Sequence, residues 1–386
     1  MFFKNALVYR FNREIKFDAA QLETQLKEFM FTPCGEKDKQ KFGWVEPMGR
    51  LGGQAMTHVG NGNILLTAQL QVKNVPSKNL AKAVKERVDK IEAVEGRPLK
   101  KIERDAIRDD AFNEMLPRAF ETDTYSHLLI MPALNLIVVD ATSYNKAENS
   151  LALLRKTIGS LPVVPVVPKS AVETIMTQWI KTGETPAGIT ALDKIVLSSI
   201  VEQGGKATLA KQDLSADEVK NHIEANKVVT SLELNWQDRI SFKLSDDFSI
   251  KTLKWSDELK DENDDIPRED GMARFDADFA LACGEFAAFL PELFEAFDGL
   301  TEVSVAGKVS YADCLKEEPL VENAIELAVE TRRASVSAIQ RKFKIGYNRA
   351  ARIMEMLEAL EIVSAPGHSG TREVLVSDQK EEVDNA

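Results

Sequence analysis

A short basic stretch near the carboxyl end of the chain constrains the fold most. Residues 332–352 hold seven basic and no acidic residues, in a chain of 386 residues with a net charge of −12. Apolar residues at helical spacing follow Pro319 and predict a helix before this stretch. Ser335 can cap a second, short helix, and Gly346 marks a turn before a longer helix that starts at Tyr347. The predicted order is helix, helix, turn, helix.

Two short strands complete this unit. Residues 362–364 and 372–376 have strand-forming composition, and the loop between them is rich in turn residues. Residues 319–376 therefore predict a winged helix. An arginine on a helix in the major groove can contact guanine O6 and N7 in a bidentate manner. The alternative is a solvated basic face. The candidate DNA-binding residues here are Arg332, Arg333, Arg341, Lys342, Lys344, Asn348, Arg349 and Arg352, with His368 and Arg372 on the wing.

The same unit resembles the gamma module of the FtsK DNA translocase. The resemblance is carried by SVSAIQRKFKIGYNRAARIMEMLEALEIVS and GHSGTREVL. It implies a winged helix that reads short, G-rich, strand-oriented DNA sites and also contacts a site-specific recombinase. The motor that normally precedes this module is not indicated. Gly204-Gly205-Lys206 is followed by Ala207 and lacks the upstream glycine of a phosphate-binding loop.

Composition limits the class of protein. Hydrophobic residues at 44% and charged residues at 28% are ordinary globular values, and the length suits two or three domains. An acidic chain with a sequence pI near 5.1 cannot coat nucleic acid with its whole surface, so DNA binding needs a local patch or channel. Cys34, Cys283 and Cys314 are widely spaced and predict reduced thiols. Without a long apolar run, a cytoplasmic, nucleoid-associated protein with no membrane partner is expected.

Residues 1–318 predict a mixed α+β fold. Strands are expected near the amino terminus and around residues 64–70, 128–130, 136–139, 228–236 and 240–244. Helices are expected from Asp18, over 146–158, from Asp257 and over 279–297. Ser215 to Glu218 predicts a capping box that opens a helix to Asn226.

A basic excess occurs between the predicted strands. Residues 73–108 contain eleven basic and six acidic residues, in two predicted helices broken at 96–98. Lys78, Lys82 and Lys85 fall on one helix face and could follow a phosphate backbone. The alternative is a solvated helix pair with internal ion pairs.

Residues 1–298 resemble the RdgC family of recombination-associated DNA-binding proteins. The motifs include TPCG, LPRAF, ALLRKTIGSLPVVP, NHIEANKVVTSLELNW and REDGMARFDADFALACGE. The resemblance implies a homodimer closed into a ring around duplex DNA, little sequence preference, and restraint of RecA-mediated strand exchange. It also implies that Phe120 of LPRAF is an aromatic subunit contact that acts as a gate. Arg118 beside it, Arg97, Lys211 and Gln212 are further DNA-binding candidates. The alternatives are a core aromatic for Phe120 and an exposed strand end for Lys211 and Gln212.

The sequence thus predicts a non-catalytic DNA-binding protein in four parts. These are an encircling part (1–300), a linker (301–318), a winged helix (319–376) and an acidic disordered tail (377–386). The partners expected are double-stranded DNA, single-stranded DNA as a second ligand, a second copy of the chain, RecA as the restrained activity, and a site-specific recombinase. No cofactor and no metal are expected.

Two alternative functions use other residues. One is an adaptor whose winged helix docks a recombinase or another protein. The other is a metal-dependent nuclease, because the acidic run over residues 257–270 has enough carboxylates for two Mg²⁺ ions.

Overall fold

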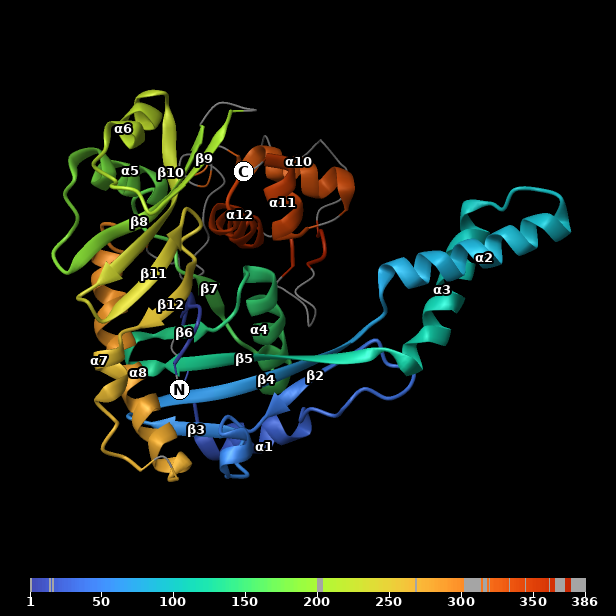
Figure 1. The fold of residues 1–386 in the computed structure, drawn as a ribbon, viewed down its shortest axis with the longest axis horizontal. Helices are drawn as coiled ribbons and strands as arrows, with labels where there is room; N and C mark the ends of the chain where they lie inside the picture. Colours follow the sequence, from blue (N-terminus) through green and yellow to red (C-terminus); the bar gives the residue numbers. More distant parts are fainter. Residues whose placement is uncertain are drawn as a thin grey trace.

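A computed structural model defines the fold. It describes residues 2–13, 15, 17–199, 204–267, 269–301, 314, 318, 320–332, 334–343, 345–360, 362–364 and 372–375. Within these residues, two antiparallel sheets share a long helix, a helical arm projects from one sheet, and a small helical unit lies beside both (Figure 1). The mixed α+β class predicted from sequence is confirmed.

The first sheet has seven strands and is called sheet 1. Its order is β2-β4-β5-β6-β1-β7, with β3 paired to the free part of β4. The strands are β1 (Leu7–Phe11), β2 (Gln40–Val45), β3 (Thr57–Gly60), β4 (Asn63–Asn74), β5 (Phe120–Met131), β6 (Leu136–Val139) and β7 (Val163–Pro165). Short 3-10 helices lie at Gly49–Leu51, Leu116–Arg118 and Pro132–Leu134.

One face of sheet 1 is covered by α1 (Ala19–Glu28) and α4 (Tyr144–Ile158). Asp18 starts α1 as predicted, because its carboxylate accepts a hydrogen bond from the Ala20 amide at 2.9 Å. Leu66 and Leu128 on the strands and Leu151 on α4 belong to the same buried cluster. This cluster is referred to below as the α4 core.

The second sheet, sheet 2, has the order β12-β11-β10-β8-β9. Its strands are β8 (Ile189–Ser199), β9 (Lys206–Ala210), β10 (Lys227–Trp236), β11 (Ile240–Ser245) and β12 (Ile250–Trp255). The helices of this part are α5 (Val172–Thr182), α6 (Asp217–Glu224), α7 (Asp257–Asp261) and α8 (Gly271–Glu295).

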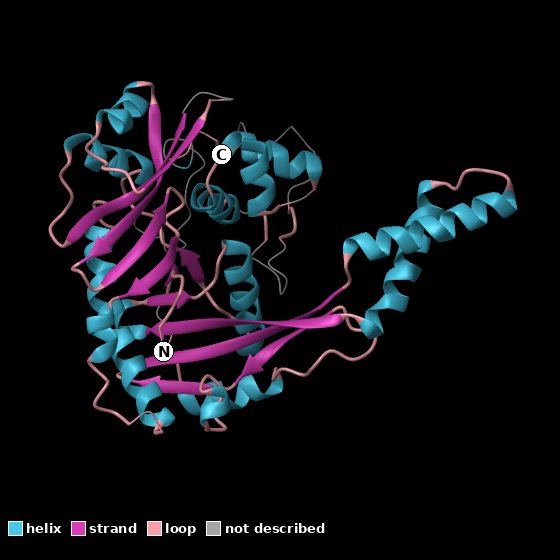
Figure 2. Ribbon diagram, in the orientation of Figure 1, coloured by secondary structure: helices cyan, strands magenta, loops and turns pink. Residues whose placement is uncertain are grey.

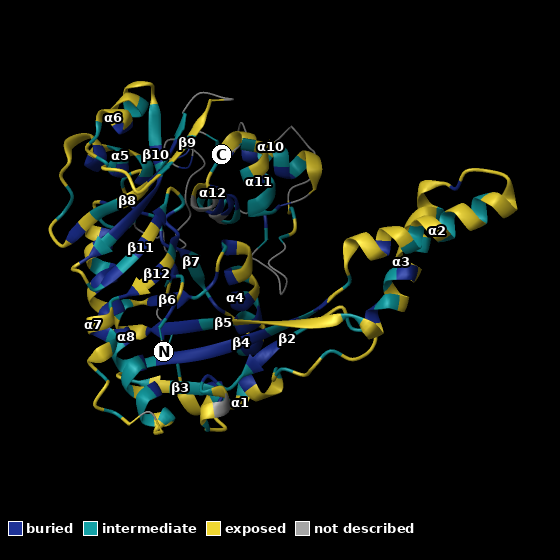
Figure 3. Cartoon of the chain, in the orientation of Figure 1, coloured by how far each residue is buried: buried dark blue, intermediate teal, exposed yellow. Residues whose placement is uncertain are grey.

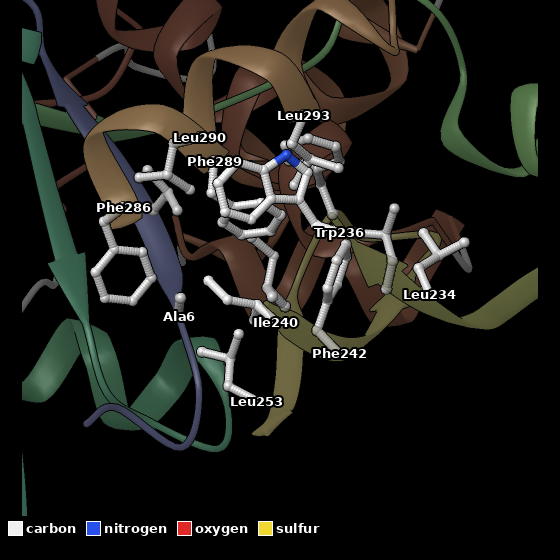
Figure 4. Close-up of a cluster of buried hydrophobic side chains, with 14 of the residues drawn as sticks. Ala6, Leu234, Trp236, Ile240, Phe242, Leu253, Phe286, Phe289, Leu290 and Leu293 are labelled. Carbon is white, nitrogen blue, oxygen red and sulfur yellow. The ribbon is translucent and has the colours of Figure 1, made fainter. Parts of the chain in front are cut away.

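The longest helix, α8, joins the two sheets through one core. Phe286, Phe289 and Leu293 of α8 pack with Trp236 and Phe242 of sheet 2 (Figure 4). The same cluster contains Leu65, Leu129 and Val138 of sheet 1. Trp236 also donates a hydrogen bond from its indole N–H to Glu292 at 2.6 Å, so the buried ring has a polar partner.

The arm is a pair of helices, α2 (Ser77–Glu95) and α3 (Lys101–Met115), that extends away from the sheets (Figure 2). The break predicted at 96–98 is present. Gly96 has φ 67°, a left-handed conformation that glycine adopts without strain. β4 leads into α2 and α3 leads back into β5, so the arm continues a two-stranded ribbon of sheet 1.

The last unit contains α10 (Val321–Thr331), α11 (Val336–Phe343) and α12 (Tyr347–Ala359), with single bridges between Ala334 and Arg372 and between Val363 and Val374. Ala324, Ile339 and Ile353 help form its own core. Ser335 accepts from the Ala338 amide at 3.2 Å, which confirms the predicted cap.

One predicted cap is wrong. The helix α6 starts at Asp217 with Ala216 at its N-cap, and Ser215 does not cap it. Instead, the Ser215 hydroxyl and amide both donate to the Asp213 carboxylate, at 2.6 and 2.9 Å. The nearby carboxylate holds Ser215 in a turn that precedes the helix.

Candidate nucleic-acid interface

A lysine-rich surface lies on the face of sheet 2 that points away from α8. Cross-strand pairs place these side chains together, because paired residues of antiparallel strands point to the same face. Lys243 pairs with Lys251, and Ser241 pairs with Lys254. Ser198 pairs with Lys206, and Lys194 pairs with Ala210. We call Lys194, Lys206, Lys243, Lys251 and Lys254 the lysine face.

The lysine face is accessible. Lys194, Lys206, Lys243 and Lys254 are exposed, and Lys251 is half-buried. The positions between them in the same strands, such as Phe242 and Leu244, are buried in the core with α8. The strands thus alternate between apolar residues inside and lysine, serine or threonine outside. Side chains of this kind contact phosphate and sugar without reading sequence.

One acid sits in the lysine face. Glu233 of β10 is 8% exposed and lies opposite Lys243. Its carboxylate forms ion pairs with Lys194 at 3.0 Å and Lys254 at 3.5 Å. The hydrogen bond and charge of Glu233 raise the pKa of Lys194. Glu233 therefore favours the charged form of Lys194 and offsets part of the positive field of the lysine face.

Lys211 and Gln212 lie at the edge of this surface. They follow β9 directly, Lys211 has φ 58°, and the Gln212 amide donates to the Asp193 carbonyl at 3.4 Å. Both residues are exposed. Gln212 also lines a cavity of about 500 Å³ beside Trp179. Lys211 and Gln212 therefore lie next to Lys194. They also form the exposed strand end that was the alternative to a DNA-binding role.

The arm carries its lysines on the outside. Lys78, Lys82 and Lys85 of α2 are all exposed. Arg97 at the tip is engaged instead by Glu103, with bonds of 3.0 and 2.7 Å, and by Glu95 at 2.7 Å. Their hydrogen bonds and charges raise the pKa of Arg97. Two carboxylates already offset the charge of this guanidinium, so less of it is available to another anion.

Phe120 and Arg118 lie where the arm meets sheet 1. Phe120 opens β5 and is 85% exposed, so the alternative of a core aromatic is wrong. Arg118 in the preceding 3-10 helix is also exposed. At the arm tip, Val94 and Ile102 are 88% and 81% exposed. Figure 3 shows the outer half of β5 as exposed and β4 beside it as buried. Single exposed apolar residues are common, but Phe120 is a whole aromatic ring in solvent and is therefore a candidate contact residue.

The candidate base-reading helix, α12, has an engaged arginine. Arg349 donates to Glu318 through Nε at 2.8 Å and through a terminal nitrogen at 2.9 Å. The Glu318 side chain is 8% exposed, whereas that of Arg349 is 52% exposed. Burial raises the pKa of Glu318, but its bonds to Arg349 and to the Leu320 amide outweigh this and lower it. Arg372 is engaged similarly by Glu358 and by the Ser364 carbonyl.

The other predicted residues of this unit are dispersed. Arg341 and Lys342 are exposed on α11, and Arg352 is half-buried on α12. Arg332 ends α10 in a left-handed conformation with φ 51°. Arg333, Lys344, His368 and the side chain of Asn348 lie outside the described residues, as do the wing loop and the acidic tail.

The acidic run does not form a metal centre in the part of the chain that the structure describes. No three His, Cys, Asp or Glu residues gather there in an arrangement that could hold an ion. Asp264 pairs with Arg274 at 2.6 Å, and Glu262 pairs with Arg239 at 3.0 Å. Asp264 and Glu262 are thus engaged in ion pairs near the ends of α7 and α8.

Sequence reasoning missed the lysine face. A signal was available, because Lys243, Lys251 and Lys254 occupy the outward positions of strands whose inward positions are apolar. The order of strands in the sheet was needed to place Lys194 and Lys206 beside them. Strand order depends on pairing between segments far apart in the chain.

Comparison with known proteins decides the family. Residues 1–300 match the family model described as "Putative exonuclease, RdgC". The chain belongs to the RdgC family. It is 47% identical over 299 residues to the "Recombination-associated protein RdgC" of Aeromonas hydrophila subsp. hydrophila, a match that spans 78% of this chain and 98% of that protein.

Other RdgC relatives agree. The proteins of the same name from Enterobacter sp. (strain 638) and Edwardsiella ictaluri are each 46% identical, over 299 and 301 residues. These matches span 78% of this chain and 98% and 99% of the relatives. The matched lengths are close to that of the family model, which ends at residue 300, before α10.

The carboxyl-terminal part of the chain matches a different family model. Residues 316–377 match the FtsK gamma domain. Among the described helices of this RdgC chain, none is long and apolar enough to cross a bilayer.

Proposed function

We propose that this RdgC protein is a non-catalytic DNA-binding protein that acts as a homodimeric ring around duplex DNA. In this proposal it restrains RecA during homologous recombination in the nucleoid, and its winged helix adds affinity or sequence preference. The observation that carries the proposal is the lysine face. Five lysines on one sheet surface of a chain with net charge −12 concentrate positive potential where a backbone can lie.

The projecting arm supports the ring. A ring needs each subunit to reach its partner at two places, and the arm carries exposed apolar groups at its tip and base, Val94, Ile102 and Phe120. Phe120 and the arm tip are proposed as subunit contacts. Lys78, Lys82, Lys85 and Arg118 would then face the DNA path with the lysine face.

The FtsK gamma domain supports a second contact with DNA. A ring that grips the backbone without sequence preference and a tethered reader would bind the same duplex at a raised effective concentration. Arg349 and Arg352 on α12 are the proposed base-reading residues, and Arg341 and Lys342 on α11 the proposed phosphate contacts.

Salt dependence tests the lysine face. If DNA binding neutralises ~6 phosphates, log Kd should change with log salt with a slope near 5 in magnitude. Lys243→Ala with Lys254→Ala should lower this slope by roughly 2 and weaken binding to all duplexes alike. Lys181→Ala, an exposed lysine on α5, is the control. A slope near zero in the native protein, or no effect of the double change, would refute the proposed surface.

A comparison of full-length protein with residues 1–300 tests the division of labour. Both should bind random duplex and slow RecA strand exchange, and only the full chain should distinguish G-rich from random duplex. If full-length protein and residues 1–300 treat all duplexes alike, the winged helix is better explained as an adaptor that docks a recombinase.

A further inference from the structure

The candidate base-reading helix is buried on two of its sides. Ala350, Ile353 and Leu357 face the core of the C-terminal unit and are fully buried. Ala351 lies ~100° further around the helix. It is 6% exposed and belongs to the α4 core, with Leu151 and Leu154 of α4. Its side chain therefore packs against the RdgC part of the molecule.

Further contacts join the same two parts. Val336 of α11 packs both in the C-terminal unit and against the α4 core. Arg155 of α4 is half-buried, and of the charged residues in the C-terminal unit Glu358 attracts it while Arg372 repels it. Burial lowers the pKa of Arg155, and Glu148 and Glu358 oppose that shift. Arg349 interacts electrostatically with Glu173 of α5 as well as with Glu318.

A recognition helix must enter the major groove to bring its side chains to the base edges. The unit's own core already covers one side of α12, and the α4 core covers the adjacent side. While Ala351 is packed against α4, the RdgC part therefore occupies a side of α12 that one wall of a surrounding groove would need. In the same arrangement, Arg349 is held by a buried carboxylate.

We propose that the α4 surface is a docking site for the chain's own winged helix, and that α12 reads DNA only after it leaves this site. The docked arrangement is the closed state, and DNA competes with α4 for α12 and with Glu318 for Arg349. The RdgC family model ends at residue 300 and the FtsK gamma match begins at residue 316, so the occupant of the site belongs to a unit outside the RdgC match. This inference rests on the proposed DNA-reading role of α12.

Two changes on opposite sides of the contact test the inference. Ala351→Gln introduces an uncharged side chain that is too large for the buried position. Arg155→Gln removes the guanidinium on the RdgC side of the contact. Ala287→Gln, the same alanine change at an exposed position of α8, is the control. Because Arg155 lies in the RdgC part, its variant remains informative if Ala351→Gln disturbs the winged helix itself.

Two measurements are made on each full-length variant. Small-angle X-ray scattering reports release of the winged helix as an increased radius of gyration. Titration with a G-rich duplex reports affinity, which should rise about fivefold or more, because the binding-competent fraction of α12 increases. Ala287→Gln should change neither.

The outcomes separate the two ideas. A larger radius with higher affinity in both variants supports the closed state. An unchanged radius and affinity in both variants overturns it. A larger radius without an affinity gain overturns the inference and the DNA-reading role of α12 together, while the salt dependence of the lysine face remains a separate test of the ring.

Discussion

Glu233 illustrates how one side chain can set the strength of a surface. Glu233 lies in the centre of the lysine face. Its partners Lys194 and Lys254 come from β8 and β12, which flank the strand pair β10 and β11. A buried carboxylate is costly unless it is paired, so these lysines are held in place. The arrangement orders the surface and reduces its net charge by one.

Glu233→Gln should strengthen DNA binding. The amide keeps a polar group at this site but leaves Lys194 and Lys254 without a counter-charge, so phosphate becomes their partner. Affinity for random duplex should rise about threefold to tenfold at low salt, and the salt slope should steepen by roughly 1. Glu218→Gln, an exposed acid on α6, is the matched control. Equal binding by Glu233→Gln and native protein at every salt concentration would show that phosphates do not reach these lysines.

Phe120 poses a different question, because an aromatic ring that is 85% exposed contributes little to the folded monomer. Phe120→Ala should leave the melting temperature nearly unchanged but weaken self-association about tenfold or more, as loss of an aromatic anchor at an interface does. Sedimentation velocity measures the association. Tyr125→Ala, on the same strand and 53% exposed, is the comparison. A dimer of undiminished stability would remove Phe120 from the interface.

At the scale of elements, the arm tip is organised by charge. Glu103 accepts from the Lys100 amide at 2.7 Å and binds Arg97, while Glu92 accepts from the Leu99 amide at 2.8 Å. These contacts join the end of α2 to the start of α3. The hydrogen bond from Arg97 and that from the Lys100 amide lower the pKa of Glu103 to about 2.

The arm tip should therefore resist acid. Since the folded pKa of Glu103 is depressed, its stabilising contribution is complete above the unfolded value near 4.5 and is lost as the pH falls through about 2. Carboxyl NMR titration of Glu103 checks this. Arg97→Ala should return the Glu103 pKa towards its ordinary range and, because Arg97 is already neutralised, weaken DNA binding less than Lys243→Ala with Lys254→Ala. A normal Glu103 pKa in the native protein contradicts the contact.

Elements governed by local rules were predictable from sequence. The Asp18 cap, the Ser335 cap and the break at Gly96 depend on residues next to them in the chain, and each was predicted correctly. The Ser215 cap was wrong because Asp213 competes for the same hydroxyl. The pairing of Glu318 with Arg349 spans 31 residues and could not be read from spacing. The lysine face needed strand order for the same reason.

At the scale of the whole molecule, α8 makes one folding unit of two sheets. Phe286 is fully buried. The centroid of its ring lies 5.5 Å from that of Phe3, which precedes β1 of sheet 1, and 5.3 Å from that of Trp255 in sheet 2. Cys283 lies one turn earlier on the same buried side, where burial raises its thiol pKa to about 12. Disturbance of this side of α8 is expected to affect both sheets together.

Phe286→Ala should destabilise the native state by ~3–5 kcal/mol, because it leaves a cavity in a core shared by both sheets. Urea unfolding followed by tryptophan fluorescence measures the loss, because Trp44 lies in sheet 1 and Trp236 and Trp255 lie in sheet 2, so that both sheets contribute to the signal. Both should respond in a single transition, and Cys283 should react with thiol reagents only across that transition. Ala287→Ser, exposed on α8, should behave like the native protein. Two separate transitions would show that α8 does not couple the sheets.

The ribbon that carries the arm has a mechanical consequence. β4 and β5 each run for 12 residues without glycine or proline, from the interior of sheet 1 to the base of the arm. Hinges usually rely on a few loop or element-terminal residues that absorb the rotation, and the ribbon has none along its length. The ribbon should then bend elastically, with a restoring force that grows with displacement, while any hinge rotation is confined to the element ends at the arm base, Pro76 and the 3-10 helix Leu116–Arg118. In the proposed ring, a closed circular duplex could enter only by deflecting the ribbon by about the width of the duplex, whereas a linear duplex could pass its end through the closed ring.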